Sequence, residues 1–249
     1  MQTIKYLIIR FSSIGDIVLT TPVIRGLKQQ VGNAEIHFVT KQKHASIVHS
    51  NPYVDKVHIL KENINELLDE LEKEHPDYII DLHQNFRSNR IKNRLKIPSF
   101  SFEKLNLQKF LLVQFKINRL PEKHIVDRYM ETVSVFDIKN DGLGLDFFIP
   151  ENEQFETKRL PEFFQGGFLV FVIAGTYSTK KLPVSKVVEI CNSLKFPVIL
   201  LGGKNEIKAA GEIDSQTGEN IHNLVGKLSL NQSASLVRDA RLVLSNDTG

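Results

Sequence analysis

The chain has 249 residues, of which 41% are hydrophobic, and a formal net charge of +3. That length is enough to bury two cores or one large one. The single cysteine, Cys191, is expected to be a core thiol in a reducing compartment. Arg10 interrupts the N-terminal apolar run before a signal peptide is complete, and the longest uncharged stretch, residues 165–179, is too short and too glycine-punctuated to cross a bilayer. We therefore expect a soluble, cytoplasmic protein.

The first predicted elements are a strand at residues 5–10 and a helix at residues 17–31, joined by a turn that contains Ser12, Ser13, Gly15 and Asp16. The turn places Asp16 at the carboxyl end of a strand, the edge at which open α/β sheets bind ligands. Its backbone N–H groups suit an anion. It lacks both the G-x-G-x-x-G spacing of dinucleotide folds and the G-K-[ST] ending of a P-loop. A carboxylate at such a turn suggests chemistry on something other than a nicotinamide or an ATP γ-phosphate.

Apolar runs and amphipathic segments alternate through the rest of the first half. Further strands are predicted at residues 35–40, 57–60 and 78–82, and further helices at residues 43–49, 63–74, 88–95, 106–117 and 125–136. This βαβα alternation predicts a parallel, doubly wound sheet. Residues 140–145 are rich in turn formers and precede the extended residues 147–150, so they are expected to be a linker.

The stretch from residue 83 to residue 119 contains nine basic residues and one acidic residue, Glu103. Large apolar side chains are interleaved with the charges: Phe86, Phe100, Phe102, Phe110, Leu111, Leu112 and Phe115. Such a stretch is typical of binding to an anionic membrane surface, a phosphorylated glycolipid or nucleic acid. The alternative is a solvated helix face above a core stripe. The concentration of one sign of charge favours an anionic partner.

A second α/β unit is predicted from residue 168. Strands at residues 168–173, 197–201 and 241–245 each deliver small, hydroxyl or charged residues to one edge, and helices follow the first two. Two sheets whose carboxyl edges face one another predict an enzyme with a cleft. The last strand ends in a ligand-type loop at residues 246–249 that should feed a helix and further strands, so we expect a truncated chain or a fragment.

Seven segments, taken in order, resemble glycosyltransferase family 9, the ADP-heptose:lipopolysaccharide heptosyltransferases. They are RFSSIGDIVLTTP (10–22), DLHQNFRSN (81–89), HIVDRY (124–129), GTYSTKKLP (175–183), LLGGKNE (200–206), NLVGKLSL (223–230) and SNDTG (245–249). The resemblance implies a GT-B architecture, two Rossmann-like parallel-sheet domains facing a cleft. Residues 1–145 would bind the acceptor, and residues 146–249, an incomplete domain, would bind the nucleotide sugar.

The resemblance also implies inverting transfer of a heptose or related sugar from ADP-heptose to a lipopolysaccharide core acceptor. Asp16 would be the general base that takes the proton of the acceptor hydroxyl. A helix N-terminus stabilises its ionised form and weakens it as a base, which is tolerable if proton transfer lags bond cleavage. The alternative is that Asp16 only caps its helix.

On the donor side, Lys180 aligns with the family lysine that offsets charge on the leaving diphosphate, although Lys181 is adjacent. Leu182 stands where the family often has a tryptophan. No D-x-D motif or His/Cys cluster with ligand spacing is present, so no metal or other cofactor is expected. The other donor-side residues implied are Gly175 and Thr176 at the phosphates, Glu206 at the ribose, Leu228 at the base, and the loop of Asp247, Thr248 and Gly249.

On the acceptor side, the basic stretch now has an expected partner, because core lipopolysaccharide precursors are acidic and membrane-bound. Arg87, Arg90 and Arg94 would form one positive helix face, in addition to the turn residues Ser12, Ser13 and Gly15. The enzyme would be peripheral to the inner membrane, with no nucleic acid partner. Two alternatives remain: a non-transferase GT-B enzyme such as a nucleotide-sugar epimerase, and an inactive truncated fragment that binds anionic lipid or nucleic acid.

Overall fold

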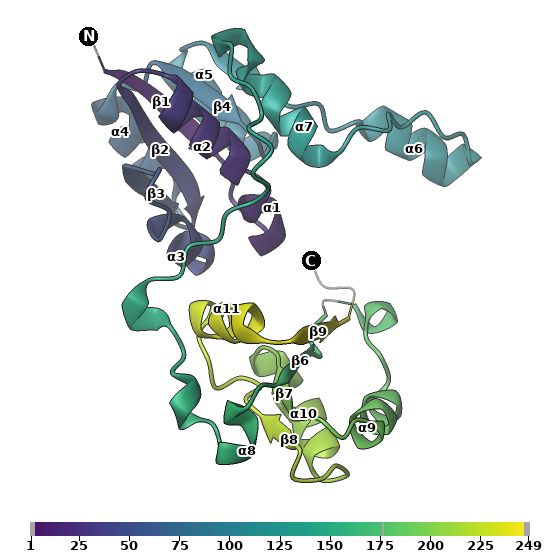
Figure 1. The fold of residues 1–249 in the computed structure, drawn as a ribbon. Helices are drawn as coiled ribbons and strands as arrows, with labels where there is room; N and C mark the ends of the chain where they lie inside the picture. The colour runs from purple at the N-terminus through teal and green to yellow at the C-terminus, as the bar shows by residue number, and fades with distance from the viewer. Residues whose placement is uncertain (1–2, 176, 247–249) are drawn as a thin grey trace. The chain divides into compact units, whose positions relative to one another are not determined.

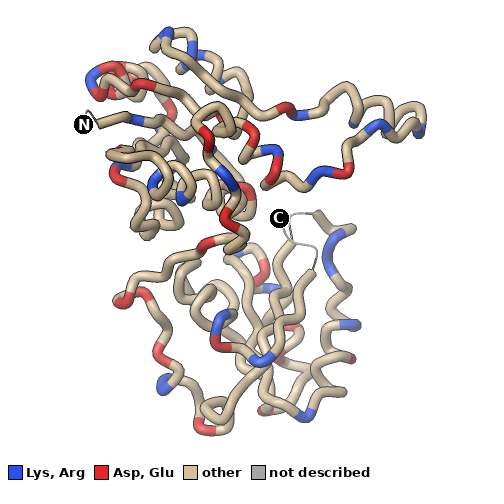
Figure 2. The backbone as a smooth tube through the Cα atoms, turned by 45° about the horizontal axis from the view of Figure 1, so that its top comes forward, with Lys and Arg blue, Asp and Glu red and all other residues tan. Residues whose placement is uncertain are grey.

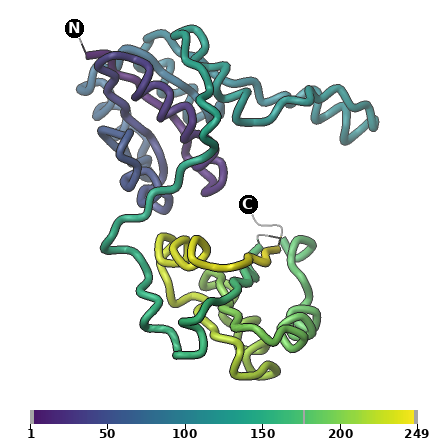
Figure 3. Tube along the Cα trace, in the orientation of Figure 1, coloured from purple at the N-terminus to yellow at the C-terminus, as the bar shows by residue number. Residues whose placement is uncertain are grey.

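The computed structural model describes residues 3–175 and 177–246. The chain divides into two compact units, unit 1 (Met1–Phe148) and unit 2 (Ile149–Gly249), whereas the boundary drawn from the sequence falls after residue 145. Figures 1 and 3 follow the chain from the purple N-terminus of unit 1 to the yellow end of unit 2. Each unit is built around a parallel sheet.

The sheet of unit 1 has five strands in the order β3-β2-β1-β4-β5, and every neighbouring pair is parallel. The strands are β1 (Ile4–Ile9), β2 (Ala34–Lys41), β3 (Lys56–Leu60), β4 (Tyr78–Asp81) and β5 (Ser99–Ser101). Because all of them run the same way, their carboxyl ends share one edge of the sheet. This confirms the doubly wound α/β class predicted for the first half.

Helices cover both faces of this sheet, except α6 (Asn106–Phe115), which stands away from it (Figure 1). They are α1 (Ile14–Val18), α2 (Thr21–Gln30), α3 (Ala45–His49), α4 (Ile64–Glu74), α5 (Phe86–Leu95), α6 (Asn106–Phe115) and α7 (Ile125–Met130), with 3-10 turns η1 (Gln42–His44) and η2 (Glu131–Phe136). Alternate residues of β1 face opposite sides. Leu7 and Ile9 belong to a core cluster with Leu71 and Ile91 of α4 and α5, and Tyr6 and Ile8 are equally buried on the other face.

The single helix predicted at residues 17–31 is wrong, because the structure has two helices there. α1 begins at Ile14 and ends at Val18, and α2 begins at Thr21. Pro22 has no N–H to offer to the preceding turn, and the hydroxyls of Thr20 and Thr21 donate to the carbonyls of Ile17 and Val18. Asp16 therefore stands within a short helix rather than in the loop before it.

The segment predicted to be a linker is attached to unit 1 by a buried arginine. Arg25 of α2 donates to both carboxylate oxygens of Asp141 at 2.6 and 2.7 Å and to the carbonyl of Gly144 at 3.0 Å. It also pairs with Asp146. These bonds lower the pKa of Asp141 to about 2. Residues 140–146 therefore pack as part of unit 1 instead of forming a free connection.

The sheet of unit 2 has four parallel strands in the order β8-β7-β6-β9. The strands are β6 (Leu169–Val172), β7 (Val198–Leu201), β8 (Ile221–Asn223) and β9 (Leu242–Ser245). The helices are α8 (Glu162–Gln165), α9 (Val184–Ser193), α10 (Ile207–Asp214) and α11 (Leu230–Asp239), with 3-10 turns η3 (Glu151–Glu153), η4 (Thr157–Arg159), η5 (Ser178–Lys180) and η6 (Lys204–Glu206).

Apolar clusters lie on both faces of the unit 2 sheet. One contains Phe171, Val198 and Leu200 together with Cys191 of α9, whose burial raises its pKa to about 11. Cys191 is therefore the core thiol that the sequence predicted. The other cluster contains Val170 and Ile199 with Leu236 of α11. Within the part of the chain that the structure describes, no helix combines the length and apolarity needed to cross a bilayer.

Candidate active-site residues in the two units

Asp16 lies just beyond the carboxyl end of β1, held by the residue before its helix. Ser13 donates from its backbone N–H and its hydroxyl to Oδ2 of Asp16, at 3.1 and 3.0 Å. Such bonds from the residue that precedes a helix to a carboxylate in the first turn are a common way to begin a helix. Asp16 therefore does help to cap its helix, as the alternative drawn from the sequence proposed. Both of these bonds go to Oδ2 of Asp16.

Arg10, the first residue after β1, forms the main ion pair of Asp16. Its Nη2 is 2.5 Å from Oδ2 of Asp16. Arg10 also donates from Nε to the Ser12 carbonyl at 2.7 Å, and from Nη1 to the Leu82 carbonyl at 2.5 Å and the Tyr129 hydroxyl at 3.0 Å. These partners come from the ends of β1 and β4 and from α7. The buried guanidinium is thus fixed by three elements.

The environment of Asp16 keeps its carboxylate ionised. Partial burial raises the pKa of Asp16, but the Ser13 N–H, the Arg10 charge and the side-chain hydrogen bonds from Arg10 and Ser13 together bring this pKa below its usual value. The Asp16 side chain is 38% exposed, so its carboxylate is accessible from solvent. Unit 1 therefore presents a charged carboxylate at the carboxyl edge of its sheet, the edge at which open α/β sheets bind ligands.

The end of β4 brings further polar groups to the same edge. Asp81 is buried, pairs with Lys92 Nζ at 3.0 Å and accepts hydrogen bonds from the backbone N–H groups of His83 and Gln84 at 3.0 and 2.7 Å. His83 packs against Phe11, with ring centroids 4.8 Å apart. Its Nδ1 is buried and has no hydrogen-bond partner among the described residues.

His83 is neutral at physiological pH. Burial is the largest influence, and the charges of Arg10 and Lys104 add to it, so the pKa of His83 falls to about 4. A neutral imidazole with one free nitrogen can accept or donate a hydrogen bond to a ligand. Sequence reasoning quoted the DLHQN segment but assigned His83 no role, because nothing in the sequence places it beside Arg10.

The other residues predicted for the acceptor side fall in different places. Ser12 accepts the Nε bond of Arg10, and Gly15 lies inside α1, where its carbonyl accepts from Leu19 at 2.9 Å. Among the three arginines of α5, Arg87 is exposed in the first turn of the helix, next to the carboxyl edge of the sheet. Arg94 follows seven positions later, about 10 Å along the helix axis.

Arg90 and Arg94 turn toward α4 rather than toward a free surface. Arg94 donates to Glu72 at 2.6 and 2.7 Å and to Asp69 at 3.2 Å, and Arg90 donates to Asn65 at 2.9 Å. The expected positive face is therefore partly neutralised, since α4 supplies acids that compensate Arg94. Acceptor binding by these arginines stays a prediction. Arg87 is the best placed of the three for it, because it is exposed next to the carboxyl edge of the sheet.

In unit 2, the carboxyl ends of β6 and β7 carry a second ion pair. Lys181 Nζ is 2.7 Å from Oε1 of Glu206, and Oε2 of Glu206 accepts from the N–H of Gly203 at 3.1 Å. A Cβ at Gly175 would lie 2.9 Å from Cγ of Lys181 and one at Gly202 would lie 3.3 Å from Cβ of Glu206. Glycine at these positions lets the two side chains lie across the loop backbones.

Asn246, after β9, ties these loops together. It accepts from the N–H of Leu182 at 3.2 Å and donates to the carbonyl of Ile173 at 3.0 Å. Beside the Lys181–Glu206 pair is a cavity of about 320 Å³. Its lining combines apolar and polar side chains, among them Ile173, Leu182, Pro183, Asn205 and Ile213. Leu182, which stands where the family often has a tryptophan, therefore forms part of the wall of a cavity next to the predicted donor residues.

The remaining donor-side predictions are only partly placed. Lys180 ends the 3-10 turn η5 and is exposed. Leu228 packs at the edge of the cluster that contains Leu224 and Leu236. Thr176 and the loop of Asp247, Thr248 and Gly249 lie outside the described residues. The roles assigned to all of these residues stay predictions.

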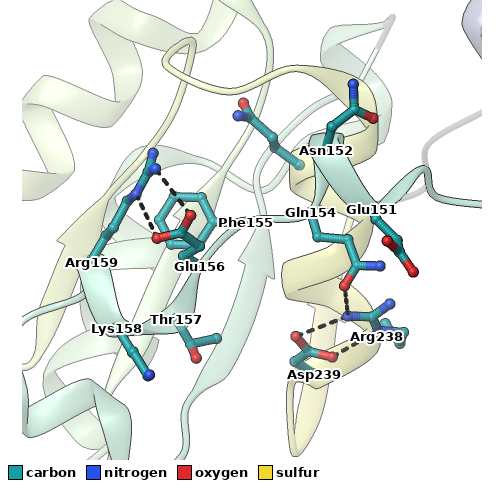
Figure 4. Close-up of a pocket in the computed structure, with 11 residues that line it drawn as sticks. Glu151, Asn152, Gln154, Phe155, Glu156, Thr157, Lys158, Arg159, Arg238 and Asp239 are labelled. Carbon is teal, nitrogen blue, oxygen red and sulfur yellow. Dashed lines mark hydrogen bonds and ion pairs between the residues drawn. The ribbon is translucent and has the colours of Figure 1, made fainter.

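A larger hollow in unit 2, of about 580 Å³, contains none of the motif residues (Figure 4). It lies between residues 151–159 and α11, and none of its lining residues belongs to the loops that follow β6, β7 and β9. Four of its charges pair with one another: Arg159 donates to Glu156, and Arg238 donates to Asp239 and also to Gln154. We therefore do not assign it to the active site.

Two parallel α/β units with charged groups at their carboxyl edges define the fold class of the GT-B glycosyltransferases, and solved structures confirm the fold. E. coli ADP-heptose lps heptosyltransferase II is similar with a TM-score of 0.78 at 19% identity, over 98% of this chain and 80% of that one. E. coli heptosyltransferase WaaC with ADP is similar with a TM-score of 0.73 at 20% identity, over 98% and 82%.

The sequence itself shows the family. The model of glycosyltransferase family 9 (heptosyltransferase) matches residues 64–249, and the chain belongs to this family. Lipopolysaccharide heptosyltransferase 1 of Campylobacter coli is 24% identical over 98% of this chain and 79% of its own length. The resemblance drawn from the seven motifs is thereby confirmed, and the protein is a glycosyltransferase.

Proposed function

We propose that this glycosyltransferase transfers a heptose from ADP-heptose to a lipopolysaccharide core acceptor, with inversion at the anomeric carbon and without a metal ion. Family membership supports a sugar transfer, and the names of the Campylobacter and E. coli relatives support this donor and acceptor. The observation that carries the mechanism is the exposed Asp16 carboxylate, held at the end of β1 by Arg10 and Ser13.

Asp16 acts as the general base in this proposal. The acceptor hydroxyl attacks the anomeric carbon from the side opposite the leaving nucleotide, and Asp16 takes the hydroxyl proton. Because Arg10 and Ser13 lower the pKa of Asp16, the carboxylate is a weak base that stays ionised well below neutral pH. Proton transfer then occurs late, once the new C–O bond has made the hydroxyl proton acidic.

The donor is held by residues of unit 2. Lys180 offsets the negative charge that grows on the diphosphate as the glycosidic bond breaks, in place of a metal ion. The Gly175–Thr176 turn and the loop of Asp247, Thr248 and Gly249 contact the phosphates and sugar, and Leu228 flanks the base. Glu206 accepts hydrogen bonds from ribose hydroxyls, since each of its oxygens retains a lone pair after bonding Lys181 and Gly203.

The acceptor meets residues of unit 1 at the inner membrane face. Ser12, Ser13 and Gly15 lie beside Asp16, and Arg87 with Arg90 and Arg94 attracts the acidic groups of the acceptor. His83 and Lys104 join them, because both lie near Arg10 at the same edge. The enzyme is peripheral to the membrane and needs no nucleic acid partner.

The test is transfer from ADP-heptose to a Kdo-lipid A acceptor, with the anomeric configuration of the product read by NMR. We expect an inverted product in the presence of a chelator. Conversion of donor without acceptor would instead indicate an epimerase. Absence of transfer with this and other nucleotide sugars would overturn the proposal. Titration with anionic vesicles and with duplex DNA would then show whether the chain only binds anionic lipid or nucleic acid.

A further inference from the structure

Helix α6 stands away from the sheet of unit 1, at the end of an arm formed by residues 104–123 (Figure 1). The arm is anchored at its base. Phe102 is buried against Tyr129, with ring centroids 4.9 Å apart, and Arg128 donates to the carbonyl of Glu103. Beyond this base, none of the ten residues of α6 is buried.

The exposed side chains of the arm are large and apolar. Leu107 is 67% exposed, Phe110 54%, Val113 63% and Phe115 61%. Leu107, Phe110 and Val113 recur every three positions, so they share one side of the helix. Among the other aromatic residues of the basic stretch, Phe100 packs on Phe136 and Phe102 is buried, whereas Phe86, at the start of α5, is 78% exposed. The apolar character of α6 is therefore a property of the arm and not a core stripe.

A helix of this length has little stability of its own. Isolated helices shorter than about 12–15 residues are marginal in water, and in proteins most of their stability comes from packing. α6 has ten residues and packs no fully buried side chain. An apolar surface that covers its exposed side would supply the missing stabilisation.

The charges around α6 identify that surface. Residues 104–121 contain Lys104, Lys109, Lys116 and Arg119 and no acidic residue, and Figure 2 shows blue positions toward the end of the arm. A second copy of the chain would bring the same positive charges against these, so self-association through α6 is disfavoured by repulsion. An anionic bilayer offers acyl chains for the apolar side chains and phosphates for the basic ones.

We propose that the α6 arm docks on an anionic lipid bilayer, with Leu107, Phe110 and Val113 among the acyl chains and the basic residues at the headgroups. Ten helical residues are about 15 Å long, half of the hydrocarbon thickness, so the helix lies in the interface and does not span it.

Docking would also orient the candidate active site. Tyr129, on which the base of the arm packs, accepts a hydrogen bond from Arg10, the partner of Asp16. A continuous series of contacts therefore connects the arm to Asp16, the proposed general base. This part of the inference rests on the proposed function, since it supposes an acceptor held in the same bilayer. The docking itself requires no substrate.

The test uses tryptophan fluorescence, because the sequence contains no tryptophan. F110W places a probe on α6, and F163W places a matched probe on α8, where Phe163 is 59% exposed. Vesicles of phosphatidylcholine containing phosphatidylglycerol should shift the F110W emission to the blue and let brominated lipids quench it. Vesicles of phosphatidylcholine alone, and F163W with either, should show neither effect. No shift for F110W, or equal shifts for both probes, would overturn the proposal.

Vesicle sedimentation of the otherwise unaltered protein separates the apolar and charged contributions. F110S/V113S and K109Q/K116Q should each lower binding to phosphatidylglycerol vesicles on the order of tenfold, and added salt should weaken binding. K195Q/K208Q, which removes two exposed lysines from unit 2, should bind like the parent. Dimerisation that F110S/V113S abolishes, without vesicle binding, would contradict the proposal. None of these readouts needs sugar transfer, so failure here is distinct from failure of the proposed function.

Discussion

Each unit has an ion pair at the carboxyl ends of its strands. The two pairs differ in which partner, the cation or the anion, is buried. In unit 1 the cation is buried: the Arg10 side chain is 10% exposed and the Asp16 side chain 38%. In unit 2 the anion is buried: the Glu206 side chain is 9% exposed and the Lys181 side chain 33%. In each case the backbone fixes the buried partner, through the carbonyls of Ser12 and Leu82 for Arg10 and the Gly203 N–H for Glu206.

The exposed member of each pair is the one that solvent reaches. Unit 1 therefore presents a carboxylate, which can accept a proton, and unit 2 presents an ammonium group, which can face a diphosphate. The two edges therefore differ in which charge is anchored by the backbone. This contrast supports the division proposed above, with acceptor chemistry at Asp16 and donor binding in unit 2.

Asp16→Asn should remove the exposed carboxylate that distinguishes unit 1 from unit 2. The amide cannot take the acceptor proton, so we expect turnover to fall by about 10²- to 10⁴-fold while the Kd for ADP is unchanged. Steady-state transfer rates and calorimetric ADP titration would measure the two effects. Glu66→Gln, on the exposed first turn of α4, is the matched control and should keep its activity. A turnover near that of the parent would remove Asp16 as the base.

Arg10→Met should remove the buried cation that pairs with Asp16. Loss of a mostly buried partner with three further hydrogen bonds should cost about 2–4 kcal/mol of folding free energy, measured by urea unfolding. The pKa of Asp16 should rise once the Arg10 charge is gone. The carboxylate then protonates at a higher pH, so the acid limb of kcat/KM moves upward.

Arg159→Met is the control for this experiment, because Arg159 and Glu156 form an exposed pair in unit 2. Exposed pairs contribute about 0–1 kcal/mol, and this one is remote from the motif residues. We expect little change in stability and an unmoved acid limb. An acid limb that stays in place in Arg10→Met would contradict the claim that Arg10 sets the pKa of Asp16.

His83→Gln tests a further group at the unit 1 edge, a half-buried imidazole near Arg10. Burial lowers the pKa of His83 from 6.5 to about 4, so between these values the unfolded chain binds a proton that the folded chain does not. Folding stability is therefore not reduced by His83 above about pH 6.5, and it decreases as the pH falls from 6.5 toward 4. From pH 7 to pH 5 the loss attributable to His83 should be about 1–2 kcal/mol.

Urea unfolding at the two pH values measures that loss. The His83→Gln variant should lose less stability on acidification than the parent does, by this amount. His49→Gln, at an exposed position on α3, should retain the parent's pH dependence. If both variants lose as much stability as the parent, the environment assigned to His83 is wrong.

The sequence predicted the long elements of the fold better than the short ones. Strands expected at residues 5–10, 35–40 and 78–82 occur as β1, β2 and β4, because buried parallel strands are continuous apolar runs. β5 and β8 have three residues each, too few for a periodic pattern. α11 was missed because polar side chains occupy buried positions: Asn231 donates to Glu153, and Ser235 accepts from the Phe155 N–H.

The candidate site was predicted where local order determines it and missed where distant residues meet. Asp16 follows a strand directly, so its place at the sheet edge could be foreseen. Its partner Arg10 was read only as a break in an apolar run, because Leu82 and Tyr129, which fix it, are far away in the sequence. The pairing of Lys181 with Glu206 likewise joins two separate loops. Motifs identify such residues, but only the fold assigns their partners.

The smallest expected effect decides which lysine of unit 2 faces the diphosphate. Lys181 is committed to Glu206 by the ion pair, and the family alignment assigns the phosphate to Lys180. Lys180→Met should therefore raise the Kd for ADP about tenfold, which corresponds to about 1.4 kcal/mol. Lys195→Met, at an exposed position in the same unit, is the control and should bind ADP like the parent.

A double-mutant cycle with Glu206→Gln completes this test, with ADP affinity measured by calorimetry. Lys181→Met and Glu206→Gln should be non-additive, because each variant removes the same ion pair. Lys180→Met and Glu206→Gln should be additive, since Lys180 acts on the ligand and not through Glu206. If Lys181→Met alone weakens ADP binding and Lys180→Met does not, the exposed cation of the pair is itself the phosphate ligand. In that case the ligand would meet the exposed member of the ion pair in both units, the anion Asp16 in unit 1 and the cation Lys181 in unit 2.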